Sequence, residues 1–162
     1  MRTTSDLGFY IGDICYVLAD NIYSLIWGDI YDYSMPKDGF IVPKGTMVNN
    51  LPLERDFVVC VESTAYGDGE YYDNNGHIYP VDAGVIGVVP LELCCKQQNG
   101  LHLGRVIEVL GEATLECPTR GNFVICVGNT IVTINTDEYG NEDEEYDYDE
   151  EVEDYEDDDN MY

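Results

Sequence analysis

The sequence predicts a mostly β domain, a small sandwich or barrel of antiparallel strands with one short helix, followed by a disordered acidic tail. Short apolar or alternating runs recur along residues 9–135, separated by glycine, proline and asparagine. An Asn-Gly pair at 75–76 lies between two tyrosine-containing runs, and both residues accept the positive φ of a hairpin turn. After Thr136 the composition changes to acids and tyrosines with one aliphatic residue, Val152.

The first elements are a strand and a helix. An apolar run over residues 9–18 (FYIGDICYVL), interrupted at Gly12, predicts the first strand. A helix of one or two turns follows, because Asp20 is a favourable N-cap residue and Gly28 can end the helix. Trp27, the single tryptophan, closes this segment and is expected to pack against the core.

The rest of the domain is predicted to be β. The continuous apolar run at 57–61 (FVVCV) indicates a strand buried on both faces. Gly87, inside the run at 85–89, suggests a bulge or a close crossing of another element. We expect the core to be built on 57–61, 85–89 and 123–127. The other predicted strands are 40–42, 46–48, 69–73, 77–81, 104–110, 113–117 and 130–135, with tight hairpin connections at 111–112 and 128–129.

The chain divides into a compact β domain, residues 1–136, and an acidic tail, residues 137–162. The tail cannot bury enough apolar surface to offset its ordering entropy, so it is predicted to be disordered. One interpretation of such a block is that it only keeps the protein soluble. Its interleaved tyrosines favour a binding role instead, because acids attract a basic groove and aromatic rings stack within it. The predicted partner-binding residues are Tyr139, Tyr146, Tyr148, Tyr155, Asp157, Asp158, Asp159 and Tyr162.

The charge balance argues against direct binding of nucleic acid or of an anionic membrane. Thirty-three acids against seven bases give a formal net charge of -26. The tail contains sixteen of these acids and no Lys or Arg, which leaves the body with seventeen acids, seven bases and a net charge of -10. Nucleic-acid binding depends on Lys and Arg contacts to phosphates. A basic protein surface, for example on a nucleic-acid-processing protein, is the expected partner.

Composition also predicts a cytoplasmic protein without a cofactor. The chain opens on a polar stretch, residues 1–7, and no apolar run approaches the length of a membrane span. Phosphate-loop and dinucleotide-binding signatures are absent. The cysteines lack the spacing of a zinc site and are expected to be free thiols. They are Cys15, Cys60, Cys94, Cys95, Cys117 and Cys126.

Residues 57–93 contain the densest mix of groups that could do chemistry. The predicted hairpin within residues 67–81 presents acids and tyrosines, and we expect this hairpin surface to be the functional surface of the body. It comprises Tyr66, Asp68, Glu70, Tyr72, His77 and Asp82. A small enzyme or a cation-dependent module acting at the hairpin from Asp68 to Asp82 is the alternative function.

Two specific chemistries can be weighed on these residues. Asp68, Glu70 and Asp73 suggest a calcium loop, but Asp73 stands where the EF-hand pattern needs glycine. Cys60, His77 and Asp82 could form a hydrolase triad, but Cys60 lies between valines in a core-like run, which raises the thiol pKa. No catalytic residue and no metal ligand is therefore assigned.

The last six residues, 157–162 (DDDNMY), resemble the C-terminal tip of bacterial single-stranded-DNA-binding proteins. That family ends in three aspartates, two further residues and a phenylalanine, where this chain has Tyr162. The resemblance implies docking on basic, apolar-floored pockets of DNA-repair and replication enzymes. Because the body lacks the basic groove of a single-strand binder, the tip would act as a mimic or a docking peptide.

Residues 10–93 resemble a group of small uncharacterised bacterial and phage-type proteins, through GDICYVL and TAYGDGEYYDNNGHIYPVDAGVIGVVPLEL. This chain has Ile14 where the group has proline, and Ser63 where it has glycine. The resemblance implies a bacterial or phage origin and no particular activity. The expected function is that of a non-enzymatic acidic binding protein whose tail engages a basic surface, as a nucleic-acid mimic or a phage inhibitor of a host factor. A structural or assembly protein with a solubilising tail is a further alternative.

Overall fold

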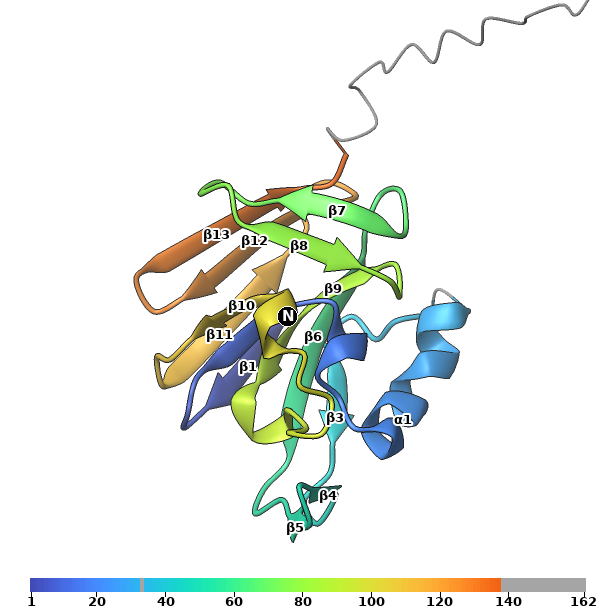
Figure 1. The fold of residues 1–162 in the computed structure, drawn as a ribbon, viewed down its shortest axis with the longest axis vertical. Coiled ribbons are helices and arrows are strands. Elements are labelled where there is room, and N and C mark those ends of the chain that lie inside the picture. The colour runs from blue at the N-terminus through green and yellow to red at the C-terminus, as the bar shows by residue number, and fades with distance from the viewer. Residues whose placement is uncertain (33, 138–162) are drawn as a thin grey trace, which may run out of the picture.

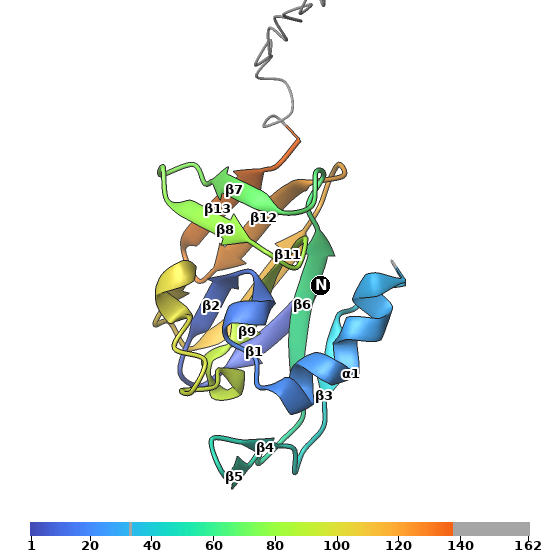
Figure 2. The same cartoon turned by 45° about the vertical axis from the view of Figure 1, so that its right-hand side comes forward.

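The computed structural model describes residues 1–32 and 34–137. They form two antiparallel β-sheets packed face to face, with a helix on the outer face of one sheet (Figure 1, Figure 2). This confirms the predicted mostly β fold with one α-helix in the described residues, and of the two predicted architectures it is the sandwich. The predicted disorder of the tail concerns residues outside the described part, apart from Asp137.

The larger sheet has five strands in the order β10-β2-β9-β6-β3. The central strand β9 and its neighbour β2 are buried at every position, because both faces of the sheet are covered here. The bounds are β10 Arg105–Ile107, β2 Phe9–Gly12, β9 Val85–Pro90, β6 Phe57–Ser63 and β3 Phe40–Val42.

Alternate residues of this sheet serve two separate cores. Val59 and Val61 face the helix, whereas Cys60 between them faces the second sheet. The prediction that residues 57–61 form a strand buried on both faces is confirmed. Gly87 in β9 is the predicted close crossing, because a Cβ there would stand 2.5 Å from Ile14 Cγ2 and 2.7 Å from the carbonyl oxygen of Cys60.

The second sheet has four strands in the order β1-β11-β12-β13. The bounds are β1 Arg2–Ser5, β11 Gly111–Glu116, β12 Asn122–Val127 and β13 Thr130–Asn135. The hairpin predicted at 128–129 is confirmed by β12 and β13. The one predicted at 111–112 is wrong, because β10 pairs with β2 while β11 pairs with β1 and β12.

Helix α1, Asp20–Tyr31, packs Ile22, Ile26 and Ile30 against the five-stranded sheet. It is longer than predicted. Gly28 lies inside the helix rather than ending it, and the N-cap residue is Ala19 rather than Asp20. The burial of an isoleucine every four residues outweighs the low helix propensity of one glycine, about 1 kcal/mol.

The strand predicted at 9–18 ends early. After β2 the chain turns at Asp13 into a short 3-10 helix, Ile14–Tyr16. The Asp13 carboxylate caps this helix, because its Oδ1 accepts a hydrogen bond from the backbone N–H of Cys15 at 3.0 Å. Further 3-10 helices are Leu91–Leu93 and Leu101–Leu103.

Two hairpins project from the sandwich. The predicted hairpin at 69–81 is confirmed as β7, Gly69–Tyr72, paired with β8, Ile78–Val81. It lies across one end of the second sheet, close to the end of β13 (Figure 1). A second hairpin pairs β4, Met47–Val48, with β5, Leu51–Pro52. Among the described residues, no helix is long and apolar enough to cross a membrane.

Candidate functional site

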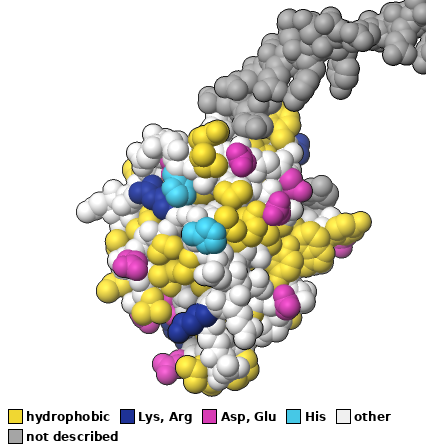
Figure 3. Space-filling model, in the orientation of Figure 1, with side chains coloured by type: hydrophobic (Ala, Val, Ile, Leu, Met, Phe, Trp, Pro, Cys, Tyr) yellow, Lys and Arg dark blue, Asp and Glu magenta, His cyan; other side chains and the backbone are white. Residues whose placement is uncertain are grey.

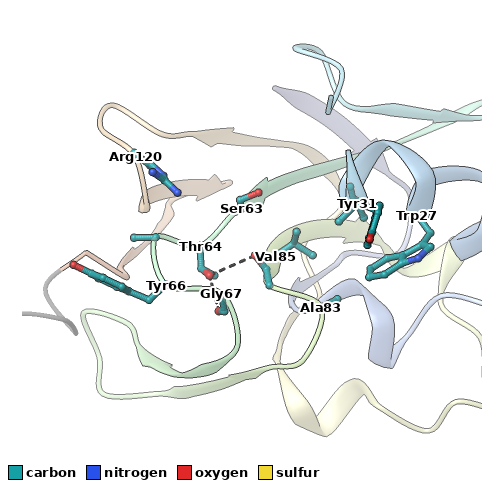
Figure 4. A pocket seen from close by; sticks show the side chains of 12 residues that line it. Trp27, Tyr31, Ser63, Thr64, Tyr66, Gly67, Ala83, Val85 and Arg120 are labelled. Atoms are coloured by element: carbon teal, nitrogen blue, oxygen red, sulfur yellow. Dashed lines mark hydrogen bonds between the residues drawn. The ribbon is translucent and has the colours of Figure 1, made fainter. Parts of the chain in front are cut away.

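A concave site, called here the aromatic groove, lies between helix α1 and the turns at residues 63–67 and 83–85 (Figure 4). Its cavity volume is about 740 Å³. The groove is lined by Trp27, Ile30, Tyr31, Ser63, Thr64, Ala65, Tyr66, Gly67, Ala83, Gly84, Val85 and Arg120.

Helix α1 supplies an aromatic wall. Tyr23, Trp27 and Tyr31 follow one another at four-residue spacing and therefore lie along one side of the helix. The Trp27 ring stacks on Tyr23 with centroids 5.4 Å apart and lies 6.3 Å from Tyr31. Trp27, expected to pack against the core, is 40% exposed and also lines the groove.

The turn at residues 64–67 is fixed by side-chain hydrogen bonds. The Thr64 hydroxyl donates to the carbonyl oxygen of Gly67 at 2.6 Å, and the Tyr71 hydroxyl donates to the same oxygen at 2.9 Å. The Thr64 backbone N–H donates to the Gly84 carbonyl oxygen at 3.0 Å, which joins this turn to the next one. Both turns therefore form one rigid floor.

Asp13 fixes the start of the turn at residues 83–85 through hydrogen bonds. Its Oδ2 accepts hydrogen bonds from the backbone N–H groups of Asp82 at 2.7 Å and Ala83 at 2.6 Å. Asp13 is fully buried, and this burial raises the pKa of its carboxyl, although the bonds from Ala83 and Cys15 act in the opposite direction. A buried carboxylate with three backbone donors is a structural anchor of the groove.

The root of the tail borders the groove. Thr136 is fully buried, and its hydroxyl accepts from the backbone N–H of Ala65 at 2.9 Å and donates to the Gly121 carbonyl oxygen at 2.6 Å. Gly121 has φ +78°, and a Cβ there would stand 2.6 Å from the Cβ of Ala65. The chain therefore enters the tail beside Ala65 and Arg120.

The predicted hairpin surface is divided by the structure. Tyr66 lines the aromatic groove. Glu70 and Tyr72 face outward on β7, on either side of the buried Tyr71. Asp68 and Asp82 are exposed at the base of the hairpin, where Asp82 Oδ2 accepts a hydrogen bond from the Tyr16 hydroxyl at 2.7 Å.

His77 and Asp73 form contacts that stabilise the β7–β8 hairpin. The His77 Nε2 lies 3.1 Å from the Gly104 carbonyl oxygen. The Asp73 side chain accepts hydrogen bonds from the Tyr79 hydroxyl at 2.8 Å and from the backbone N–H groups of Asn75 and His77 at 2.8 and 3.0 Å. Asp73 Oδ2 also lies 3.6 Å from Arg105 Nη1.

Cys60, His77 and Asp82 do not form a hydrolase triad. Cys60 is fully buried, and burial raises the pKa of its thiol to about 12. Its predicted partners bond elsewhere, His77 to Gly104 and Asp82 to Tyr16. Within residues 1–32 and 34–137, no group of three or more His, Cys, Asp or Glu side chains is placed to hold a metal ion. All six cysteines are free thiols.

Charged side chains are scattered over the face of the body drawn in Figure 3. Lys and Arg side chains lie there singly, among acidic, polar and apolar ones. Arg55 and Arg105 each form an ion pair with an acid, Glu92 and Asp73 respectively. This distribution differs from the continuous basic stripe with which proteins bind nucleic acid.

Sequence reasoning missed three residues of the site and could not place others. Asp13 lies in an apolar run typical of a strand, Arg120 lies in a turn far along the chain, and Trp27 was expected to pack against the core. Only the Gly12-Asp13 interruption was a signal for the first of these. The partner-binding residues predicted in the tail, from Tyr139 to Tyr162, lie outside the described residues.

No protein-family model, no curated protein and no solved structure matches this chain. The sequence and the geometry of the site are therefore the basis for proposing a function.

Proposed function

We propose that this protein is a non-enzymatic acidic binding protein whose tail, residues 137–162, engages a basic protein surface. The observation that carries the proposal is charge segregation. The tail contains sixteen of the thirty-three acids and none of the seven bases, so it has the charge density of a polyanion. A surface that normally holds nucleic acid is the partner that such a segment fits, and an inhibitor of a nucleic-acid-processing host factor is one protein of this kind.

The anchoring of Thr136 supports this role. Two hydrogen bonds of its hydroxyl fix the start of the tail to the turns at Ala65 and Gly121, at one end of the sandwich. The tail is thus presented from a defined point rather than from a frayed strand. The body, with a net charge of -10, repels the tail and favours its availability to a partner.

The mechanism combines two interactions. The acids attract a basic surface over a distance set by the Debye length, about 8 Å at physiological salt, which accelerates association. Tyrosine rings then stack on the partner's arginine or aromatic side chains, and each such contact contributes about 0.5–1 kcal/mol at exposed sites. The free thiols support a reducing, cytoplasmic setting, either bacterial or, for a phage protein, that of the host.

The test is retention of proteins from a bacterial lysate by the full chain and by a chain ending at Thr136. Specific basic proteins should be retained by the full chain, lost on truncation and released by salt. A variant with the five tail tyrosines replaced by serine keeps the charge, so it should retain these proteins more weakly. Equal retention by the full and truncated chains would contradict the proposal.

Two controls separate the alternatives. Asp68→Ala and His77→Ala should leave retention unchanged, because both residues lie in the body. If these variants lose binding and truncation does not, the site is the hairpin, and screens for substrates and cations become the next step. If truncation changes only aggregation, the tail is a solubilising segment of a structural protein.

A further inference from the structure

The aromatic groove has features that the proposed binding by the tail does not use. Three large aromatic side chains around this one concavity face solvent, with exposed fractions of 71% for Tyr31, 54% for Tyr66 and 40% for Trp27. Grouped rings of this kind are typical of surfaces that a ligand covers. The cavity, about 740 Å³, has the size of pockets that hold small molecules, about 300–1,000 Å³.

Arg120 is the one charged side chain among the residues that line the groove. Among the described residues, ion pairs occupy Arg2, Arg55 and Arg105, and none involves Arg120. In a body with seventeen acids, the exposed Arg120 guanidinium forms no ion pair with a described carboxylate, and this favours an anion-binding role for the groove.

The charged group and the aromatic wall lie at opposite sides of the groove. Figure 4 shows Arg120 on one side and the rings of Trp27 and Tyr31 on the other, with Ser63 and Thr64 between them. A ligand that satisfies both sides has an anionic group at one end and a planar apolar group at the other.

We propose that the aromatic groove binds a small planar aromatic anion. Its ring lies against the side chains of Trp27 and Tyr31, and its carboxylate or phosphate pairs with the Arg120 guanidinium. The floor is already fixed by the hydrogen bonds of Thr64 and Asp13, so binding does not have to order it.

The salt dependence of affinity distinguishes binding in the groove from binding by the tail. The net charge of -10 on the body opposes an approaching anion at long range, and salt screens this repulsion together with the attraction of the exposed Arg120. Raising salt from about 50 to 300 mM should therefore change the affinity of the groove little, because the two effects oppose each other. The tail's binding to a basic partner should weaken over the same range.

The experiment is a titration of the full chain with 4-hydroxyphenylacetate and, as an uncharged control with the same ring, 4-hydroxyphenylacetamide. Because Trp27 is the single tryptophan, its indole N–H gives one resonance in a ¹H–¹⁵N spectrum, which reports directly on the groove. We expect a saturable shift with the carboxylate and an affinity about three- to five-fold lower for the amide, the effect of one exposed ion pair.

Three variants make the result specific. Arg120→Gln should abolish the difference between the two probes, and Tyr31→Ala should weaken both alike. Tyr72→Ala, an exposed aromatic residue on the outer face of β7, should change neither. Equal affinity for the two probes in the original protein, or no saturable shift, would overturn the proposal. Binding that is seen only in the chain ending at Thr136 would overturn it in favour of the tail as the occupant.

Discussion

Replacing Asp13 with alanine is expected to lower the free energy of unfolding by about 2–4 kcal/mol. The substitution leaves the backbone N–H groups of Cys15, Asp82 and Ala83 without their acceptor in a fully buried site. Each unpaired buried donor costs about 1–3 kcal/mol, and the desolvation of the lost carboxylate offsets part of this sum. Urea unfolding followed by circular dichroism measures the loss.

The matched control is Asp82→Ala, because the Asp82 side chain is exposed and only its backbone N–H contacts Asp13. Its effect should stay within about 1 kcal/mol. Burial raises the pKa of Asp13 in the folded state, so the stability it contributes is fully present below its unfolded pKa and declines as pH rises through the folded value. The difference in free energy of unfolding between the original protein and the Asp13→Ala variant should therefore become smaller as pH rises. If Asp13→Ala and Asp82→Ala are equally stable, Asp13 does not anchor the groove.

Replacing Asp73 with alanine is expected to cost about 2–4 kcal/mol and to loosen the β7–β8 hairpin. The carboxylate is the acceptor for the Tyr79 hydroxyl and for two backbone N–H groups of the turn. Its removal also takes away the ion-pair partner of Arg105. Hydrogen exchange of the amides in residues 69–81, measured beside urea unfolding, should show the loss of protection in the hairpin.

The pH dependence of the Asp73 contribution has the opposite sign to that of Asp13. Burial by itself raises the pKa of Asp73, but the hydrogen bonds from Tyr79, Asn75 and His77 outweigh burial and lower the pKa below its ordinary value of 3.8. The contribution is thus present above pH 3.8 and is lost as pH falls through the folded pKa. Asp68→Ala, at the exposed base of the same hairpin, should show neither effect; if it matches Asp73→Ala, the loss is a general effect of removing charge.

The sequence was most informative where local chemistry and burial agree. The Asn-Gly pair at 75–76 predicted the hairpin because positive φ is a local requirement, and the run at 57–61 predicted a strand buried on both faces because it has no polar position. Strand β1 was missed because its buried residues, Thr3 and Ser5, are polar. The Thr3 hydroxyl donates to the Val58 carbonyl oxygen, a contact across fifty-five residues that no local pattern contains.

The site was less predictable than the fold for the same reason. The aromatic groove combines residues from α1, two turns and the loop before β12, which meet only through the sheet topology. Tyr66 is exposed, but the residues that line the groove with it, Trp27 and Arg120, are distant in sequence. The acidic tail is evident from composition alone, because its charge and its tyrosines do not depend on contacts with distant residues.

The most direct test of binding by the tail is the salt dependence of partner binding by the full chain and by the chain ending at Thr136. A protein captured from the lysate is titrated with each chain at several salt concentrations. We predict that truncation raises the dissociation constant at least about ten-fold at low salt and flattens the dependence of the logarithm of affinity on the logarithm of salt. Equal dissociation constants and equal slopes for the two chains would show that the tail does not engage a basic surface.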